Sequence, residues 1–455
     1  MRKHKAISGA ATAALIIAII VISAGAGYYV GTSSVTTATS TSAPVTIQFY
    51  ESLAPSEASF FTNTVIPQFE QANPGIRVSL VNLPSAGDVA TSVEALVSGG
   101  STGTTLVGID NLVVGELIAG NDLSNLTSAL SAVEPSGFIS SAQKMVAYEQ
   151  SVYGATYFIP FRSNVPLTFY NKTALSSAGI TSPPATTAQL LADAQALKAA
   201  GYTGPIMFQG HGGASTPTEL YQWMVQFGGN PFLLNDSGDV QTFQYLYNLS
   251  SYFNTNYIHG YWGSYVGLAS GSYQVLDYQW PYVYGLLTNS TLGMTSSTLG
   301  VYGGPAGPVN SNHLLGGDVL VVPKGATNVQ AIDTFAKFLL GAQAQTETLT
   351  KLSWVAVNSA AYTNLPANFS AVGTALQSAI SSGVFLRNPV PWITQWNAIA
   401  DNAWTKIIVD HASYSQIQSI LNAENQQLYN YLVSNYGAQT ANQYEANAFK
   451  PISVS

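Results

Sequence analysis

At 455 residues, the chain exceeds the roughly 250–300 residues that one hydrophobic core usually serves, so two lobes or domains are expected. Charged residues make up only 8% of it and the formal net charge is −8, which argues against nucleic acid as a partner because phosphate binding needs clustered lysines and arginines. The chain has no cysteine, which excludes disulfides, thiolate metal sites and cysteine catalysis.

The pattern of residues 1–30 predicts a membrane segment. Arg2, Lys3 and Lys5 precede an apolar run over residues 10–30, which at roughly 20 residues is long enough to span a bilayer with its positive end inside. The run is longer than the apolar region of most signal peptides, so we favour an anchor over cleavage near Ala24-Gly25-Ala26. Residues 5–8 resemble the processing site of archaeal pilin-like proteins, where cleavage leaves the apolar stretch as an anchor.

Residues 31–44 are almost all Ser, Thr and small residues, a composition typical of a flexible tether open to O-glycosylation. Sequons for N-glycosylation, consistent with an exported surface, begin at Asn125, Asn171, Asn235, Asn248, Asn289 and Asn368. The low charge favours an acidic exterior, since carboxylates protonate in acid and ion pairs then fail. A glycosylated surface that needs few charges is the alternative.

Strand and helix patterns begin after the tether. Apolar and polar residues alternate over residues 45–50 and predict a strand. Ser56 is the expected N-cap of the next helix, and Asn73-Pro74-Gly75 ends that helix before a strand over residues 76–81. The result is a βαβ opening.

Two later helices are predicted from caps and apolar stripes at helical spacing, one that Thr187 caps and one that Asn328 precedes. Strands that alternate with such helices are typical of α/β lobes with mainly parallel sheets.

Three sequence blocks follow one another along the chain. They are residues 69–78 (FEQANPGIRV), then Leu167–Asn171 (LTFYN) with Lys172, Gly179-Ile180 and Pro183-Pro184, and residues 317–325 (GDVLVVPKG) leading to a predicted helix over 331–340 and to Gln345. In that order and at those spacings, the blocks resemble the solute-binding subunits of ABC importers, in the group similar to maltose-binding protein. The resemblance covers roughly residues 45–428.

The resemblance implies an α/β, two-lobed, periplasmic-binding-protein-like fold with an interlobe ligand cleft and a hinge, preceded here by the N-terminal membrane segment. In that family the chain crosses between the lobes more than once. Lobe 1 would therefore take residues 45–160 and 316–365, and lobe 2 residues 161–315 and 366–455. The lobes would close around the ligand by hinge bending.

The resemblance also implies an extracellular, monomeric subunit, held at the cytoplasmic membrane by its anchor, that captures a mono- or oligosaccharide. It would deliver the sugar to ABC permease subunits, through which the ATPase would be an indirect partner. No cofactor, metal or catalytic group is expected.

Two tryptophans match positions at which the family stacks an aromatic ring on its ligand. Trp280 ends the block GSYQVLDYQW over residues 271–280, and Trp396 ends PWITQW over residues 391–396. Each has a packing alternative, which is the stronger one for Trp396 because Ile393, Trp396 and Ala400 also have core spacing.

Polar candidates follow the predicted strand ends, where open α/β sheets place their ligands. They are Glu51, Asp110, Asn111, Gly317 with Asp318, and Arg162. The acidic and amide residues are also ordinary turn residues. Arg162 could fork onto sugar hydroxyls or an anionic solute, with surface exposure as the alternative.

Three other function classes are weighed. A secreted glycoside hydrolase lacks the usual motifs, since no His-x-x-x-His, Gly-x-Ser-x-Gly or phosphate loop appears, although paired carboxylates remain open to it. Gly210-His211-Gly212-Gly213 is interpreted as a loop at the ligand cleft. A non-sugar solute is a second alternative. A pilin-like subunit, the third, would not explain the family blocks. Near Trp354 the usual Gly and Pro of the family are missing.

Overall fold

The computed structural model describes residues 43–132, 135–259, 265–363 and 369–454, and Pro44–Ser455 form one compact unit. The predicted membrane segment and nearly all of the tether lie outside the described residues. Within the described ranges, no helix is long and apolar enough to cross a bilayer.

The first sheet has five strands in the order β2-β1-β3-β11-β4. Their bounds are β1 Val45–Glu51, β2 Ile76–Asn82, β3 Thr105–Asp110, β4 Phe158–Pro160 and β11 Asp318–Val321. β1 pairs in parallel with β2 and β3, which confirms the predicted βαβ opening. β11 returns from much later in the chain and pairs antiparallel with β3 and β4.

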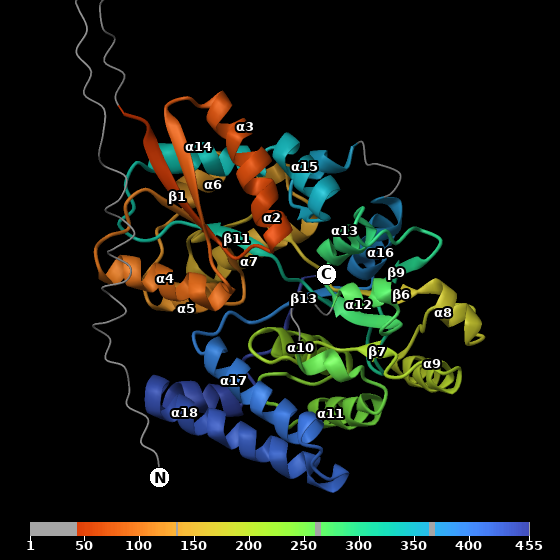
Figure 1. The fold of residues 1–455 in the computed structure, drawn as a ribbon. Coiled ribbons are helices and arrows are strands. Elements are labelled where there is room, and N and C mark those ends of the chain that lie inside the picture. The colour runs from red at the N-terminus through yellow and green to blue at the C-terminus, as the bar shows by residue number, and fades with distance from the viewer. Residues whose placement is uncertain (1–42, 133–134, 260–264, 364–368, 455) are drawn as a thin grey trace, which may run out of the picture. The chain divides into compact units, whose positions relative to one another are not determined.

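Helices cover both faces of this sheet (Figure 1). Because the connections β1 to β2 and β2 to β3 run in opposite directions along the sheet, right-handed crossovers place their helices on opposite faces. Phe69 of α3 packs on Phe335 of α14, so those two helices share a face. The helices are α2 Pro55–Phe60, α3 Ile66–Ala72, α4 Ala86–Ser98, α5 Val114–Ala119, α6 Thr127–Ala132, α7 Ser140–Tyr153, α14 Val329–Leu340 and α15 Ala342–Leu352.

The second sheet has four strands in the order β7-β8-β6-β9. Their bounds are β6 Leu167–Asn171, β7 Ile206–Met207, β8 Val275–Gln279 and β9 Leu299–Tyr302. The prediction of mainly parallel sheets is wrong here, because β6 runs antiparallel to both of its neighbours and only β7 and β8 pair in parallel.

Helices α10, α11, α17 and α18 pack against one another beside this sheet (Figure 1). The helices of this half are α8 Lys172–Ser177, α9 Thr187–Ala199, α10 Ser215–Gln226, α11 Ser237–Ser250, α12 Val266–Ser270, α13 Tyr282–Thr288, α16 Ser370–Ser381, α17 Ile393–Trp404 and α18 Ile417–Glu445.

The predicted helix starts are accurate to about one turn. The helix expected after Ser56 begins at Pro55 with Ala54 as N-cap. Thr186, one residue before the predicted Thr187, caps α9 through a bond from the N–H of Gln189. Asn328 directly precedes α14, as expected, but its side chain makes no capping hydrogen bond.

Two segments pass between the sheets side by side. Residues 161–166 connect β4 to β6 and contain β5, Arg162–Ser163, which pairs with β12, Val355–Ala356. The returning segment contains β10, His313–Leu314, which pairs with β13, Val384–Leu386, and β13 pairs in turn with β14, Ile452–Ser453. The backbones of Asn164 and Gly316 exchange hydrogen bonds of 3.0 and 2.8 Å. These paired connections join the two halves of the α/β, two-lobed fold.

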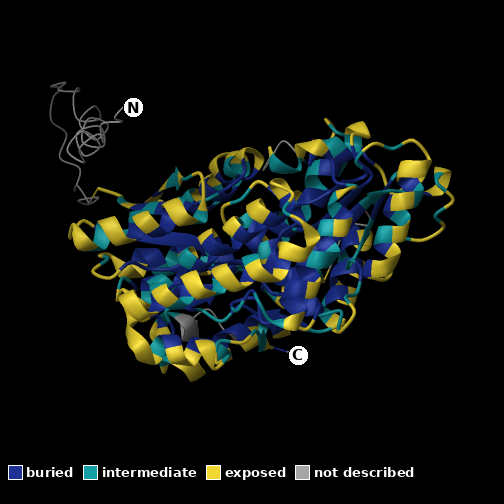
Figure 2. Cartoon of the chain, turned by 90° about the horizontal axis from the view of Figure 1, so that it is seen from below, coloured by how far each residue is buried: buried dark blue, intermediate teal, exposed yellow. Residues whose placement is uncertain are grey.

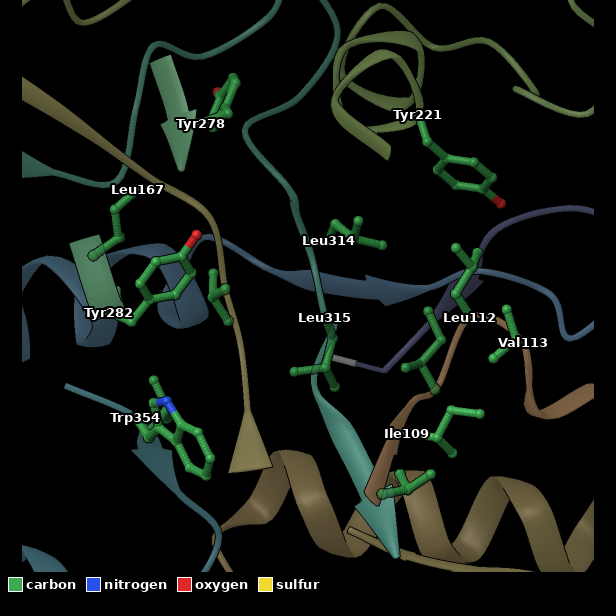
Figure 3. Packing of buried hydrophobic residues seen from close by; sticks show 14 of the residues in the cluster. Ile109, Leu112, Val113, Leu167, Tyr221, Tyr278, Tyr282, Leu314, Leu315 and Trp354 are labelled. Atoms are coloured by element: carbon green, nitrogen blue, oxygen red, sulfur yellow. The ribbon is translucent and has the colours of Figure 1, made fainter. Parts of the chain in front are cut away.

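Residues on the inside of the molecule are mostly buried (Figure 2), and the buried apolar side chains form a continuous core. Figure 3 shows Leu314 and Leu315 on the returning segment, among side chains from both sheets. Both leucines are almost fully buried. The core therefore continues through the connection and holds the ends of the strands that flank the cavity described next.

Candidate functional site

A cavity of about 700 Å³ opens between the ends of the two sheets. One wall comes from the ends of β1 and β3 and the starts of β11 and α4, and the other from the end of β8, the loop over residues 209–214, α10 and α17. Of the predicted site residues, the cavity brings together Glu51, Asp110, Arg162, Trp280 and Asp318. Asn111, Gly317 and Trp396 do not line it.

Arg162 lines the cavity and is held there by buried carboxylates. Its guanidinium makes a two-pronged contact with Asp318 at 2.5 and 2.7 Å and lies 3.5 Å from Glu57. One face of the guanidinium stacks on Trp354, with its carbon 4.0 Å from the ring centroid. Burial alone would lower the pKa of Arg162, but Asp318, Glu57 and Glu51 together raise it. The surface alternative for Arg162 is therefore wrong.

Trp354 shapes the site from behind. It is almost fully buried and its indole N–H donates to Glu57 at 2.6 Å. Glu57 also accepts the N–H of Ala54 at 2.8 Å. This network fixes the guanidinium of Arg162 from two sides, so the arginine presents a fixed orientation to the cavity.

Glu51 lies at the end of β1 and is 1% exposed. One carboxylate oxygen accepts the N–H of Ser52 at 2.7 Å, and the other has no donor among the described residues. Burial, and then the negative charge of Asp318, raise the pKa of Glu51 well above its usual range, although Arg162 lowers it. A Cβ on Gly108 would lie 2.9 Å from the Glu51 oxygen, so β3 needs a glycine there.

Asp110, at the end of β3, connects the two walls. Its carboxylate lies 3.3 Å from Arg387, which also donates to Thr218 of α10 at 2.8 Å. Burial raises the pKa of Asp110, although Arg387 lowers it. Asn111 lies outside the cavity and accepts from Arg387 at 3.4 Å, so it positions the arginine.

Three aromatic rings line the wall formed by the end of β8 and the start of α13: Tyr278, Trp280 and Tyr282. Trp280 keeps part of its surface exposed. A Cβ on Gly316 would come within 3.0 Å of the Trp280 ring, so the returning segment passes directly under the indole. Trp280 therefore lines the cavity and also lies close to the backbone of Gly316; its stacking on a ligand stays a prediction.

Gly317 and Trp396 have structural roles. Gly317 has φ of +130°, and a Cβ there would lie 2.1 Å from the carbonyl oxygen of Arg162, so glycine lets the two connections approach. Trp396 is fully buried, donates to the carbonyl of Pro231 at 2.9 Å and packs on Tyr221. The structure places Trp396 in the core of α17 rather than at the cavity, as its core spacing allowed.

Sequence reasoning missed the polar stripe of α17. Its cavity-lining residues are Thr394, Asn397, Ala398 and Asp401. Their spacing of three and four residues marks one face of a helix and is the signal that could have found them. Asp401 accepts the N–H of Gly213 at 2.9 Å. The loop with His211, Gly212 and Gly213 lines the cavity, as expected.

Glu219 of α10 was also missed, because nothing in its sequence surroundings distinguishes it. It is 3% exposed and accepts the N–H of Gln209 at 2.9 Å. Burial, followed by the charge of Asp277, raises its pKa well above the usual range.

A metal centre finds no support in the part of the chain that the structure describes. No group of three or more His, Asp or Glu side chains there could hold an ion. The cavity instead combines the partly exposed ring of Trp280 with fixed carboxylate acceptors and one guanidinium donor, an arrangement suited to a ligand with apolar faces and many hydroxyls.

Comparisons with solved structures agree on the fold. Maltose-bound MalE3 of T. maritima is 18% identical with a TM-score of 0.74, covering 84% of this chain and 100% of that one. The GacH receptor of Streptomyces glaucescens is 19% identical with a TM-score of 0.72, covering 85% and 99%. A solute-binding protein of an ABC transporter from Thermotoga lettingae, bound with α-D-tagatose, is 17% identical with a TM-score of 0.70, covering 84% and 100%.

No curated protein sequence matches the chain. At identities below one fifth, the structural likenesses establish the fold alone. The sequence model of the bacterial extracellular solute-binding proteins matches residues 54–346, which is more than half of the chain. The chain therefore belongs to the family of bacterial extracellular solute-binding proteins.

Proposed function

We propose that this protein is the extracellular binding subunit of an ABC importer, that it captures a mono- or oligosaccharide in the cavity and that it delivers the sugar to permease subunits. Solved proteins of the same fold are described as bound to maltose, mannobiose and tagatose. The observation that carries the proposal is the pairing of aromatic faces at Trp280 with fixed carboxylates on the opposite wall.

Each wall has a distinct role in this proposal. Trp280 stacks on the apolar face of a sugar ring. Glu51, Asp110 and Asp318 accept hydrogen bonds from sugar hydroxyls, and Arg162 donates hydrogen bonds to ring-edge oxygens. Gly317 lets the connections approach each other, and the connections form the hinge. The lobes then comprise residues 45–160 with 316–365, and 161–315 with 366–455.

A binding role without catalysis fits this arrangement. The Arg162 contact with Asp318 is complete without a ligand, and a carboxylate so engaged is a poor general base. A micromolar dissociation constant corresponds to about −8 kcal/mol, which one stacked ring and several hydrogen bonds can supply.

Delivery to a permease requires a surface location. Residues 1–30 would anchor the monomeric protein on the outer face of the cytoplasmic membrane, with residues 31–44 as tether and glycans at some of the sequons. Burial that raises the pKa of Glu149 to about 8 and that of Asp277 to about 7 supports an acidic exterior, where both groups are neutral.

The test is a titration of the protein with maltose, mannobiose, cellobiose, tagatose, amino acids and organic anions, followed by tryptophan fluorescence. Saturable binding of a sugar is expected, and Trp280→Ala should weaken it at least tenfold while Trp280→Phe keeps most of it. Binding of an amino acid or anion alone would identify a non-sugar solute. Release of reducing ends from an oligosaccharide would instead establish a hydrolase.

A further inference from the structure

The cavity has an excess of carboxyl groups over cations. Its lining contains one guanidinium, Arg162, and one imidazole, His211. The carboxyl groups in the lining are Glu51, Glu57, Asp110, Glu219, Asp318 and Asp401. A lining with this balance attracts positive charge, most strongly where no cation of the protein lies close.

Half of these carboxyl groups have a cationic partner in the protein. Asp318 and Glu57 both contact Arg162, and Asp110 contacts Arg387. Glu51 and Asp401 form no ion pair within the usual distance. A nearby base lowers the pKa of each, however: Arg162 that of Glu51 and His211 that of Asp401.

Glu219 differs from all of them. None of the ion pairs in the described part of the chain includes it, and the one charge that raises its pKa is that of another carboxyl group, Asp277. Asp277 is fully buried in β8, accepts from Thr168 at 2.7 Å through one oxygen and has no donor for the other among the described residues. Glu219 thus lines the cavity wall as a buried carboxyl group without a counter-charge.

We propose that the ligand carries a protonated amino group, as amino sugars and their oligosaccharides do, and that Glu219 binds this ammonium. This inference rests on the proposed function and narrows its ligand class. Buried carboxyl groups without a cation are costly. Burial raises the pKa of Glu219 and so favours its neutral form. An ammonium group beside it favours the charged form and lowers that pKa, whereas a hydroxyl only exchanges a hydrogen bond with it.

The geometry leaves Glu219 available for this contact. One of its oxygens is held by the N–H of Gln209 at 2.9 Å, which orients the carboxyl group at the cavity wall. Tyr278 and Trp280 line the same wall, and their ring faces favour a nearby cation as well as a sugar ring.

The test compares sugars that differ only at C2. Calorimetric titrations of the full chain at pH 6 would use glucosamine, galactosamine and mannosamine against glucose, galactose and mannose. Cellobiose, its diamino analogue and its di-N-acetylamino analogue form a second matched set. At least one amino form is expected to bind tenfold or more tightly than its hydroxyl parent, and the N-acetyl form should lose this gain.

Glu219→Gln keeps the shape of the side chain and an acceptor for Gln209 but removes the charge. This substitution should reduce the preference for the amino form from at least tenfold, which corresponds to about 1.4 kcal/mol, to within about twofold. Glu51→Gln, the matched control at the opposite wall, should weaken amino and hydroxyl forms alike.

The outcomes separate the two proposals. If a neutral sugar binds and its amino form binds no better, the inference is overturned and the sugar-binding function stands. If the amino preference survives in Glu219→Gln, the assignment to Glu219 is overturned. If no sugar of either kind binds, the proposed function fails and the inference fails with it. The wild-type comparison decides the ligand class even if a variant does not fold.

Discussion

Replacement of Glu149 should change how the stability of the protein depends on pH. Glu149 lies on α7 and is fully buried. One oxygen accepts the N–H groups of Tyr157 and Phe158, and the other has no donor among the described residues. Burial raises its pKa to about 8, although the two N–H groups lower it. The folded state therefore holds a proton that the unfolded chain, with a pKa of about 4.3, releases.

The sign and size of this pH effect follow from the linkage between proton binding and folding. A raised pKa means that the contribution of Glu149 to stability is full below about pH 4.3 and is lost as the pH rises toward 8. At pH 7 the gap from 4.3 is about 2.7 pH units, and at 1.36 kcal/mol per unit the loss is about 3–4 kcal/mol. Glu149→Gln keeps the acceptor for both N–H groups and cannot ionise, so it should recover most of this energy at pH 7 and little at pH 4.

Urea unfolding of the wild type and of Glu149→Gln at pH 4, 5.5, 7 and 8 measures the effect. The two curves of unfolding free energy against pH should converge near pH 4 and separate by up to about 3 kcal/mol at pH 7. Glu445→Gln, at the exposed end of α18, is the control and should follow the wild type. Parallel curves for Glu149→Gln would refute the reasoning. A wild type that collapses between pH 5 and 3 would refute the acidic-exterior hypothesis.

Three further predictions concern the cavity and its surroundings. Trp396→Ala should cost about 3–5 kcal/mol of stability because it empties a packed core site, and the loss should appear as a lower Tm. Trp280→Ala should leave Tm nearly unchanged and weaken sugar binding. The reverse pattern would contradict both roles. Glu116 accepts the N–H and the hydroxyl of Thr394, both at 2.9 Å, and so ties α5 to the start of α17. Glu116→Ala should weaken ligand binding about fivefold, which corresponds to about 1 kcal/mol, and expand the protein in X-ray scattering; an unchanged radius of gyration with unchanged affinity would exclude a closing contact. Gly317→Ala should fold poorly, as thermal melting would report, because its Cβ would meet the Arg162 carbonyl at 2.1 Å; a wild-type melting curve would show that the connections can separate.

Local patterns in the sequence determined the elements and the family. The alternation over residues 45–50 and the stop at Asn73-Pro74-Gly75 predict β1, α3 and β2 because hydrophobic periodicity and turn residues act within a few positions. Trp280 was assigned to the ligand cleft by resemblance to the family, and it lines the cavity.

Only the tertiary structure decided the charge pairs and the direction of the strands. The partners of Arg162 come from β11 and α2, and no pattern around residue 162 announces a partner more than one hundred positions away. The antiparallel course of β6 was unreadable for the same reason, since pairing depends on where a distant strand returns. Burial also decided between the two predicted stacking residues. Both tryptophans match stacking positions of the family, but Trp280 lines the cavity and Trp396 lies in the packed core. Whether a side chain meets ligand or core depends on what the rest of the chain packs against it.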